Sequence, residues 1–566
     1  MRKVASKKTE IPAYWAICLI IGLAFFLRIW GLSFGLPELY HADEPIVVNH
    51  ALAYGTGDLN PHFFKIPPLV SYLLFGVYGF YFLFLKAFGW VGSVSDFQLL
   101  FLGDPGSFYW LARFIFGALC GTATVYLLYR LVKRHFTVQH GLAAAFFLAA
   151  AFLHVRDSHF IYADIPLLFV LVACFFSILK VLEKNTLINA VFFGILFGTA
   201  VAVKYNGVFV FIPFALADFC NKKNAHPFVN LMAAGLVSLL CFGALNPYSW
   251  LDAKFFFAEL LGQSSAEGFA GMLHHLMYSL SGGVGIPLLV LGLAGLLQAI
   301  VRADKKRFVI AAFVIVYYGV LCFFSQPYDR YVLPLVPFFS FFAADCLIDL
   351  QQRVRLPALF FWVLVIAASL PSLAKSALCD SLFMRKDVRT LVRERAEAVI
   401  PAGSKVALDV PFFMPRLLPS AAQLEEKQNE LLQTGDTGSA RLKRVRLMLD
   451  RAGRTGKPGY QLYFLNKKPA AAGFLFAKPA VPYSVSELKR LGVQYVFTAK
   501  INPGFEPDFY RDLKREAMLM ARFSPYKDEA IEWPVYIQPL TGGPFLWKEL
   551  VSRQRNGQII ELYKLA

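Results

Sequence analysis

Residues 67–89 read PPLVSYLLFGVYGFYFLFLKAFG, and the way in which this stretch meets a membrane decides the topology of the whole chain. It is long enough to cross a bilayer, because about 20 apolar residues span the hydrocarbon core. It is also rich in phenylalanine and tyrosine, which is typical of a segment at the membrane interface. Whether this stretch crosses the membrane decides on which side every later loop lies.

Five basic clusters distinguish these two topologies. When 67–89 does not cross and the later apolar segments alternate, all five clusters face the cytoplasm; when it crosses, all five face outward. Cytoplasmic loops carry the excess of Lys and Arg in membrane proteins, so the sequence predicts that 67–89 lies in, or re-enters, the outer interface. The clusters are Arg130 with Lys133 and Arg134, Lys180 with Lys184, Lys222 with Lys223, Arg302 through Arg307, and Arg353 with Arg355.

The composition sets the fold class. The chain has 566 residues, of which 57% are hydrophobic and 16% aromatic, which is too apolar for a soluble protein. Its net charge of +18 lies in short clusters between apolar segments, which indicates membrane topology rather than nucleic-acid binding. We predict a polytopic α-helical membrane protein with about eleven transmembrane helices. The expected spans are about 12–33, 109–132, 140–155, 160–180, 187–203, 207–220, 228–246, 283–301, 308–325, 331–350 and 357–373.

Two domains are expected. Residues 1–375 form the membrane domain with a large first external loop at 34–108, and residues 376–566 form an extracytoplasmic soluble α/β domain. In the second domain the pattern predicts helices at 387–397 and 509–522, and strands at 405–409, 493–497 and 558–563. It contains no phosphate-binding loop and no nucleophile elbow, which favours an accessory role.

The first apolar run could be a signal peptide, but Arg28 interrupts its end and no small-residue cleavage site follows. We therefore expect an uncleaved first helix with a cytoplasmic N-terminus. The eight cysteines form neither a CxxC metal motif nor a disulfide framework.

Ionisable residues gather in the connections on the predicted outer face. Asp43 and Glu44 follow the first span directly, and Lys65 is the only cation in a long aromatic run. Others stand at the ends of spans, where an ionisable group at membrane depth indicates function. These are Arg113, Asp164, Lys204 and Arg330.

This set suits the transfer of a group that is carried on a lipid phosphate. A carboxylate takes the proton of the acceptor, cations hold the phosphate as it leaves, and an apolar groove takes the lipid chain. Each residue also has a structural interpretation. Asp43 and Glu44 would cap a short helix, and Asp164 before Pro166 would begin an ordinary helix. The side chains of Lys204 and Arg113 would extend to the membrane interface. His159 would pack in the interior.

The same residues resemble those of the C-type membrane glycosyltransferases that use polyprenyl-phosphate sugars, specifically glycosyltransferase family 39. That family is related to protein O-mannosyltransferases and to the aminoarabinose transferase of lipid A. The matching pieces are Asp43-Glu44, Phe64-Lys65-Ile66-Pro67-Pro68, Leu111-Ala112-Arg113, Arg156-Asp157-Ser158-His159 with Asp164-Ile165-Pro166, Lys204-Tyr205-Asn206-Gly207, and Arg330-Tyr331-Val332-Leu333-Pro334.

The resemblance implies a C-type glycosyltransferase fold and an inverting transfer of a hexosyl or pentosyl group, with no nucleotide sugar at the site. It leaves dependence on a divalent metal ion open. Asp43 is the implied catalytic base or acceptor-orienting residue, with Glu44 beside it and Asp164 in the same site. The residues expected to contact substrate are Lys65, Arg113, Arg156, His159, Lys204, Tyr205, Arg330 and Tyr331.

We therefore predict a multi-pass enzyme of the bacterial inner membrane, with its C-terminal domain periplasmic or extracellular. Its expected partners are a polyprenyl-phosphate-sugar donor, a protein, lipid or glycan acceptor, and membrane lipids, but no nucleic acid. The alternatives are a lipid or solute transporter or flippase without covalent chemistry, and a scaffold whose soluble domain acts.

Overall fold

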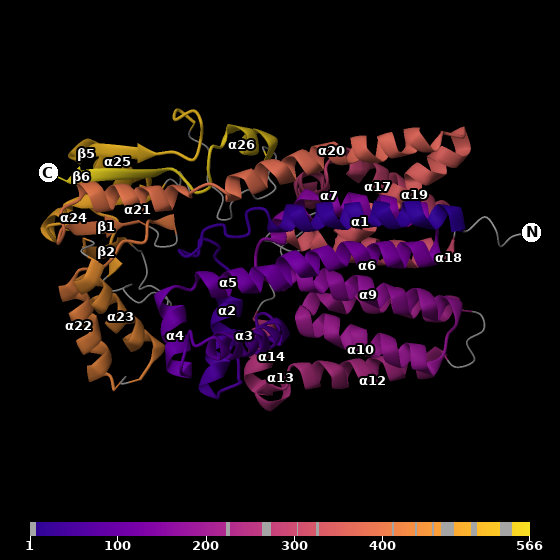
Figure 1. The fold of residues 1–566 in the computed structure, drawn as a ribbon, viewed down its shortest axis with the longest axis horizontal. Coiled ribbons are helices and arrows are strands. Elements are labelled where there is room, and N and C mark those ends of the chain that lie inside the picture. The colour runs from indigo at the N-terminus through magenta and orange to yellow at the C-terminus, as the bar shows by residue number, and fades with distance from the viewer. Residues whose placement is uncertain are drawn as a thin grey trace, which may run out of the picture.

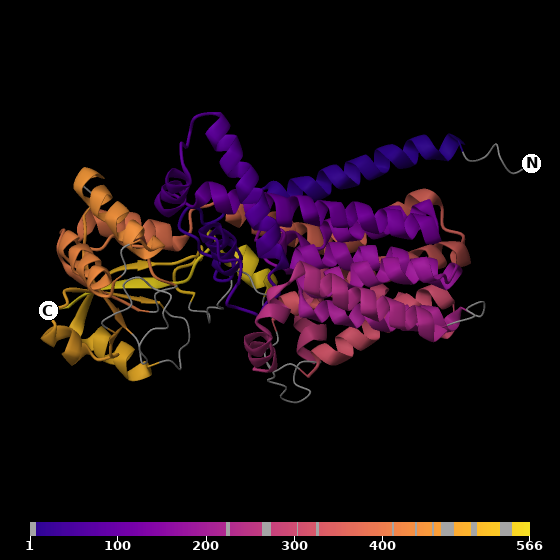
Figure 2. The same ribbon diagram turned by 90° about the horizontal axis from the view of Figure 1, so that it is seen from below.

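The computed structural model is an elongated molecule with a helical bundle at one end and a smaller α/β unit at the other (Figures 1 and 2). The first described helix, α1 (Lys7–Ile29), lies in the bundle, and the last described strand, β6 (Ile560–Leu565), lies in the α/β unit (Figure 1). The structure describes residues 7–221, 227–262, 273–302, 304–323, 328–409, 413–435, 438–455, 458–465, 480–499, 506–531 and 546–565.

The bundle helices run side by side along the long axis of the molecule (Figure 1). Each bundle helix is apolar over almost its whole surface, so each side of it must pack against another helix or contact lipid. The side-by-side arrangement meets this requirement. They are α1 (Lys7–Ile29), α5 (Gly106–Ala112) continuing through η2 (Arg113–Leu119) into α6 (Cys120–His135), α7 (Val138–Ala150), α9 (Asp164–Glu183), α10 (Leu187–Val203), η3 (Tyr205–Val210) with α11 (Phe211–Cys220), α12 (Pro227–Leu245), α17 (Ile286–Arg302), α18 (Lys305–Leu321), η5 (Asp329–Leu335) with α19 (Val336–Val354), and α20 (Ala358–Phe383).

Among the described residues, six helices are long and apolar enough to span a membrane, and a seventh span is added if the bent pair His275–Val284 and Ile286–Arg302 is counted. The fold class of a multi-span helical protein with a small sheet is confirmed at this level. Each of the eleven expected spans overlaps a helix, but several are short apolar helices, so the count of about eleven stays a prediction. The expected domain boundary at 375 falls inside α20.

Residues 67–89 contain the helix α3 (Leu69–Ala87). By length and composition alone, this helix also qualifies as a membrane span. It runs at a steep angle to the bundle helices (Figures 1 and 2). Its outward side chains are large and apolar, with Phe80 77% exposed and Leu83 59% exposed. A helix that crosses the direction of the bundle while exposing aromatic residues fits a position within the membrane interface.

A topology experiment tests this placement. A reporter fused after residue 100 is expected to report the outside and one fused after residue 135 the cytoplasm, because α3 then stays on the outer side while α5, η2 and α6 cross. Alkaline phosphatase and green fluorescent protein fusions at both sites measure this. A cytoplasmic signal after residue 100 would contradict the placement and would put the basic clusters outside.

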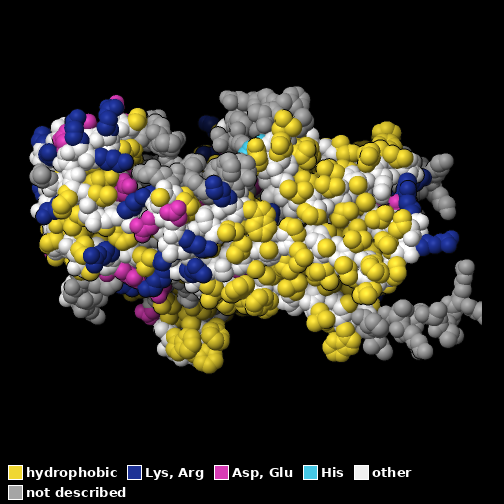
Figure 3. Space-filling view, turned by 90° about the horizontal axis from the view of Figure 1, so that it is seen from above, with side chains coloured by type: hydrophobic (Ala, Val, Ile, Leu, Met, Phe, Trp, Pro, Cys, Tyr) yellow, Lys and Arg dark blue, Asp and Glu magenta, His cyan; other side chains and the backbone are white. Residues whose placement is uncertain are grey.

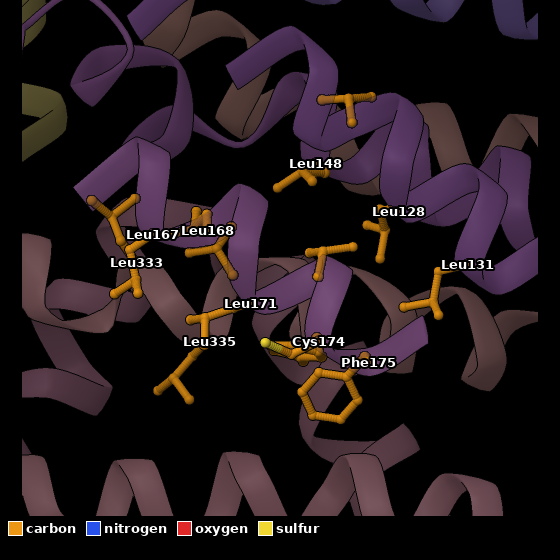
Figure 4. Packing of buried hydrophobic residues seen from close by; sticks show 14 of the residues in the cluster. Leu128, Leu131, Leu148, Leu167, Leu168, Leu171, Cys174, Phe175, Leu333 and Leu335 are labelled. Carbon is orange, nitrogen blue, oxygen red and sulfur yellow. The ribbon is translucent and has the colours of Figure 1, made fainter. Parts of the chain in front are cut away.

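Close contact between helices holds the bundle core. Figure 4 shows Leu167, Leu168 and Leu171 of α9 beside Leu333 and Leu335 of η5. A Cβ atom on Gly295 of α17 would overlap the Phe342 carbonyl oxygen of α19, so only glycine permits this close approach. Packing of this density fixes the ends of α9 and η5, which carry site residues.

Hydrophobic side chains cover much of the bundle surface, whereas Lys, Arg, Asp and Glu concentrate on the α/β unit and at the far tip of the bundle (Figure 3). This distribution is that of a membrane protein with a lipid-facing belt.

The loop between α1 and α5, which the sequence predicts to face outward and which is therefore named the outer loop, is largely helical. Its elements are α2 (Glu44–Ala53), η1 (Tyr54–Thr56), α3 and α4 (Val94–Gly103). Further short helices lie between the spans: α8 (Phe152–Asp157), α13 (Tyr248–Leu251), α14 (Ala253–Leu261), η4 (His275–Leu280) and α16 (Ser281–Val284).

Six described strands form one sheet in the order β3-β2-β1-β4-β6-β5. The first four in this order are parallel, and β6 pairs antiparallel with both β4 and β5. The strands are β1 (Lys405–Leu408), β2 (Gln461–Leu465), β3 (Ala480–Val481), β4 (Tyr495–Ala499), β5 (Ala517–Phe523) and β6 (Ile560–Leu565), and the helices are α21 (Val388–Val399), α22 (Ala421–Gln433), α23 (Ala440–Thr455), α24 (Val485–Arg490), α25 (Pro507–Glu516) and α26 (Leu546–Ser552).

One expected element is wrong in part. The sequence predicted a helix over 509–522, but α25 ends at Glu516 and residues 517–523 form β5 at the edge of the sheet. Ala, Met, Leu and Arg in this segment favour helix intrinsically. Pairing with β6 from Ala517↔Leu565 to Phe523↔Ile560 overrides that propensity, and the sequence alone does not reveal such a distant partner.

Candidate active site

The site begins where α1 ends and the outer loop turns into α2. Asp43 is the N-cap residue of α2, and its side chain forms an ion pair with Arg330, which lies on η5. The two side chains are 22% and 13% exposed, so solvent or a ligand reaches both. The carboxylate that the sequence predicted as the base is thus accessible and lies beside a cation.

A second carboxylate and a second cation lie close by. Asp164 starts α9, and its Oδ1 accepts from the Lys204 Nζ at 2.5 Å. Arg330 lies near enough to both Asp43 and Asp164 to interact with them electrostatically. The other oxygen of Asp164, Oδ2, is buried and has no hydrogen-bond partner within the described parts of the chain. One acceptor position of this carboxylate is therefore free for a ligand.

Aromatic rings join the two ion pairs. The ring of Tyr162 lies 4.8 Å from the Arg330 guanidinium and 5.6 Å from the Lys204 ammonium. The Tyr331 ring lies 5.8 Å from the same ammonium. The rings attract both cations and hold them in place. Sequence reasoning missed Tyr162, although its position two residues before Asp164 was a usable signal.

The segment that carries Lys65 is tied to the same end of α10. Tyr205 donates its hydroxyl proton to the Phe64 carbonyl oxygen at 2.8 Å, and the Phe64 amide donates to Glu259 Oε2 at 2.5 Å. Lys65 itself is exposed. The segment that contains Lys65 therefore lies beside Tyr205, the residue that follows Lys204 in the chain.

Glu44 has a different environment from Asp43. Its two oxygens accept from Arg113 at 2.7 Å and 2.6 Å, and Oε1 also accepts from the Ile161 amide at 3.0 Å. Arg113 donates further to the Leu32 and Phe34 carbonyl oxygens, and both charged side chains are fully buried. This ion pair ties α1, α2, η2 and the 158–163 connection into one unit.

Arg156 and His159 are buried as well. Arg156 is shared between Asp329 at 2.6 Å and Asp157 at 2.7 Å, and burial together with the neighbouring carboxylates raises the pKa of Asp157 to about 6, although Arg156 opposes the rise. His159 lies against the Val155 and Trp30 carbonyl oxygens. These two residues, like Arg113, are placed to support the site rather than to reach into it.

His41 positions the start of α2. Its ring stacks on Phe160 at 4.2 Å, and burial lowers the pKa of His41 to about 4, so the ring is neutral at neutral pH. The neutral Nδ1 accepts from the Asp43 amide at 3.3 Å. On the other side of the same connection, Gly117 of η2 leaves no room for a Cβ because the Ser158 carbonyl oxygen occupies that space.

The described residues contain no group of three or more His, Cys, Asp or Glu that could hold a metal ion. Asp43 and Asp164 each contact a cationic side chain instead. The described side chains around Asp43 and Asp164 therefore do not resemble a built divalent-metal site.

Comparison with known proteins finds a family match for part of this chain. The family model described as dolichyl-phosphate-mannose-protein mannosyltransferase matches residues 106–250. No curated protein matches the chain.

Several solved structures are similar at low identity. ArnT from Cupriavidus metallidurans bound to undecaprenyl phosphate is 14% identical with a TM-score of 0.46, covering 90% of this chain and 96% of that one. AglB from Archaeoglobus fulgidus, in complex with an inhibitory peptide and a dolichol-phosphate, is 12% identical with a TM-score of 0.49, covering 94% and 76%. The Pmt1-Pmt2 complex of S. cerevisiae bound to the sugar donor is 19% identical with a TM-score of 0.30, covering 49% and 37%.

The matched segment runs from α5 to α13 and carries Arg113, Asp164, Lys204 and Tyr205. The match confirms the predicted resemblance to glycosyltransferase family 39 over residues 106–250.

Proposed function

We propose that the protein transfers a sugar from a polyprenyl-phosphate-linked donor to an acceptor hydroxyl at the outer face of the membrane. The observation that carries this proposal is the juxtaposition of the Asp43–Arg330 and Asp164–Lys204 ion pairs at one end of the bundle. Two carboxylates and two cations around accessible space match a reaction that moves one proton and releases one phosphate.

The cations of the site suit the donor. The Asp43–Arg330 and Asp164–Lys204 pairs place two cations at one end of the bundle, and the segment of Lys65 lies beside Tyr205. A sugar linked to a lipid phosphate is a phosphodiester with one negative charge. Lys65, Lys204 and Arg330 would hold that phosphate and stabilise it as it leaves, while the exposed aromatic residues of α3 take up lipid.

Asp43 acts as the base in this scheme. The acceptor oxygen attacks the anomeric carbon, the bond from that carbon to the phosphate oxygen breaks, and the acceptor proton passes to Asp43. Attack from the face opposite the phosphate makes the transfer inverting. When the donor phosphate engages Arg330, the guanidinium is drawn from Asp43, and the carboxylate oxygen that accepted from Arg330 takes the proton.

Asp164 and Glu44 have supporting roles. The free Oδ2 of Asp164 is placed to accept a hydrogen bond from a substrate hydroxyl, and its Oδ1 holds Lys204. Glu44 has both oxygens occupied by Arg113 and Ile161, so it shapes the loop that presents Asp43.

Donor binding gives a testable consequence. Lys65→Ala is expected to raise the KM for the lipid-linked donor about tenfold with a smaller change in kcat, because one charge-assisted contact to the phosphate is lost. Steady-state kinetics with purified protein measures both constants. The matched control is Lys86→Ala, a lysine of the same loop that lies 5.8 Å from the Phe82 ring and is expected to leave KM unchanged. Equal effects of the two changes would contradict the role of Lys65.

Mass spectrometry of envelope glycans, glycolipids and glycoproteins from bacteria with and without the protein tests the function and identifies the sugar. We expect one sugar substituent to disappear from one acceptor class. An unchanged glycan profile under conditions of expression would contradict the proposal.

A further inference from the structure

A large cavity lies between α1 and the rest of the bundle, in the half of the bundle farther from the candidate active site. Residues of α1 form one wall, and residues of α6, α7, α9, α19 and α20 form the others. Its volume is about 1750 Å³. Small-molecule pockets usually measure about 300–1,000 Å³, so a ligand that fills this cavity is larger than a typical small metabolite.

The cavity exists because α1 is tied to the bundle near one end and stands away from it toward the other. Arg28, in the last turn of α1, donates to the Leu148 and Ala149 carbonyl oxygens, both at 3.3 Å. Toward its N-terminal end, α1 diverges from the bundle (Figure 2). Gly22 gives an independent sign of open space, because a Cβ atom there would meet no atom beyond the local helix backbone within 4 Å.

The walls of the cavity suit hydrocarbon. Ile17 and Phe25 of α1 line one side, and Trp362 of α20 lines another. Tyr14 and Cys18 also line the cavity and are exposed, so it opens at the surface of the bundle, which is largely hydrophobic. An apolar gap that opens toward lipid is filled by lipid chains, because an empty gap would lose the dispersion contacts of its walls.

Three cations lie at one end of the cavity. Arg130, Lys133 and Arg134 all line it, and their spacing of three and four positions places them on one face of α6. The Arg130 guanidinium donates to the Tyr126 hydroxyl at 2.9 Å, and the Lys133 ammonium lies 5.6 Å from the Tyr129 ring. All three cations are exposed, which contact with a headgroup at the membrane surface requires. We call them the cavity cations.

Acidic residues at this end of the bundle have other partners. Glu183 pairs with His135 at 3.2 Å and with Lys306 at 2.6 Å. Asp345 pairs with Arg307 at 2.7 Å. Among the described residues, no carboxylate forms an ion pair with a cavity cation, and none of those that line the cavity is Asp or Glu. The cavity therefore combines apolar walls with an uncompensated positive end, which is complementary to a lipid with an anionic headgroup.

This place is distinct from the site proposed for the donor phosphate. Arg113 stands at the start of η2 beside Glu44, and Arg134 lies in the last turn of α6. At 1.5 Å per residue, the helix places them about 30 Å apart. A phosphate held by the cavity cations is therefore too far from Arg330 and Lys204 to serve there as the leaving group.

We propose that the cavity binds a phospholipid with an anionic headgroup. Its phosphate contacts Arg130, Lys133 and Arg134, and its acyl chains lie between α1 and the bundle. Under the predicted topology this end faces the cytoplasm, where the leaflet carries anionic lipids and basic pockets between transmembrane helices bind their headgroups. By filling the gap, the lipid steadies α1, which leads into the loop that contains Asp43. Lipid binding of this kind is independent of sugar transfer.

Native mass spectrometry of the purified full chain in detergent measures lipid binding without a transfer assay. Phosphatidylglycerol and phosphatidylcholine with the same acyl chains are titrated separately, and the wild type is expected to bind phosphatidylglycerol at least about tenfold more tightly. Arg130→Gln/Lys133→Gln is expected to weaken phosphatidylglycerol binding at least about tenfold. The matched control Lys180→Gln/Lys184→Gln removes two exposed lysines that do not line the cavity, and it is expected to bind as the wild type does. Equal affinity for the two lipids, or equal phosphatidylglycerol affinity in the two variants, would overturn the proposal.

A second variant tests the cavity itself. Gly22→Trp directs an indole into the open space beside α1 and is expected to weaken phosphatidylglycerol binding at least about tenfold. Without lipid it is expected to melt no lower than the wild type, because tryptophan favours helix more than glycine does. The control Gly235→Trp, on α12 where a Cβ atom also meets open space, is expected to keep lipid binding. Unchanged binding in the Gly22→Trp protein would overturn the placement of the acyl chains.

Polyprenyl phosphate is the third probe, because it is also an anionic lipid. We expect Arg130→Gln/Lys133→Gln to leave its affinity unchanged. A polyprenyl-phosphate affinity that falls in this variant while the phosphatidylglycerol affinity does not would assign the cavity to the donor lipid and overturn the proposal.

Discussion

Asp43→Asn is expected to lower kcat for sugar transfer by about 10²- to 10⁴-fold, the contribution that a positioned general base makes. Asparagine keeps the size of the side chain but cannot take the proton of the acceptor hydroxyl. The change also frees Arg330 from its ion pair, so the KM for the anionic donor is expected to stay level or fall. Steady-state kinetics with a purified lipid-linked donor measures both constants.

The matched control for this variant is Asp58→Asn. Asp58 is an exposed carboxylate of the same outer loop that pairs with His62 at 2.8 Å, and its change is expected to leave transfer unaffected. Size-exclusion profiles in detergent show whether the variants remain folded. Turnover near the wild-type value in the Asp43→Asn protein would remove the assigned base.

Glu44→Gln and Arg113→Gln are each expected to destabilise the folded protein by about 3–5 kcal/mol, because removing one member of a buried pair leaves the other charge uncompensated. Arg113→Gln should be the more severe change, since the Leu32 and Phe34 carbonyl oxygens also lose their donor. Thermal unfolding in detergent, followed by loss of the monodisperse species, gives the order of stability.

The double variant Glu44→Gln/Arg113→Gln distinguishes an ion pair from two independent sites. Its loss of stability is expected to be smaller than the sum of the two single losses, because the second change removes the charge that the first left unpaired. Arg511→Gln breaks an ion pair whose side chains are 72% and 78% exposed, and it is expected to have no measurable effect. Strictly additive losses would show that Glu44 and Arg113 act separately.

The span positions were predictable because the hydrophobic runs report burial or lipid contact directly. Each expected span overlaps a helix, and α1 ends before the Asp43 loop as the sequence indicated. The edge strand β5 was not predictable in the same way, because Ala517 to Phe523 becomes a strand only through its pairing with β6.

The sequence named the candidate site residues but did not indicate how they pair. Arg330 lies 287 positions from Asp43 along the chain, so the sequence alone does not reveal that their side chains pair. The two adjacent carboxylates also lie in different environments. The Asp43 side chain is 22% exposed, whereas the Glu44 side chain is fully buried in its ion pair with Arg113. A sequence pattern of two consecutive carboxylates contains no signal for that difference, because it depends on where Arg113 lies.

The central claim is covalent transfer from a lipid-phosphate donor, and the most direct measurement uses purified protein in liposomes with polyprenyl-phosphate-linked sugars and an envelope acceptor fraction. Release of free polyprenyl phosphate and formation of a glycosylated product are followed together for the wild type and for Asp43→Asn. We expect equal amounts of released polyprenyl phosphate and glycosylated product with the wild type, and at least about 10²-fold slower formation of both with the variant. Movement of the lipid-linked sugar across the bilayer with no covalent product would contradict it and would identify a transporter.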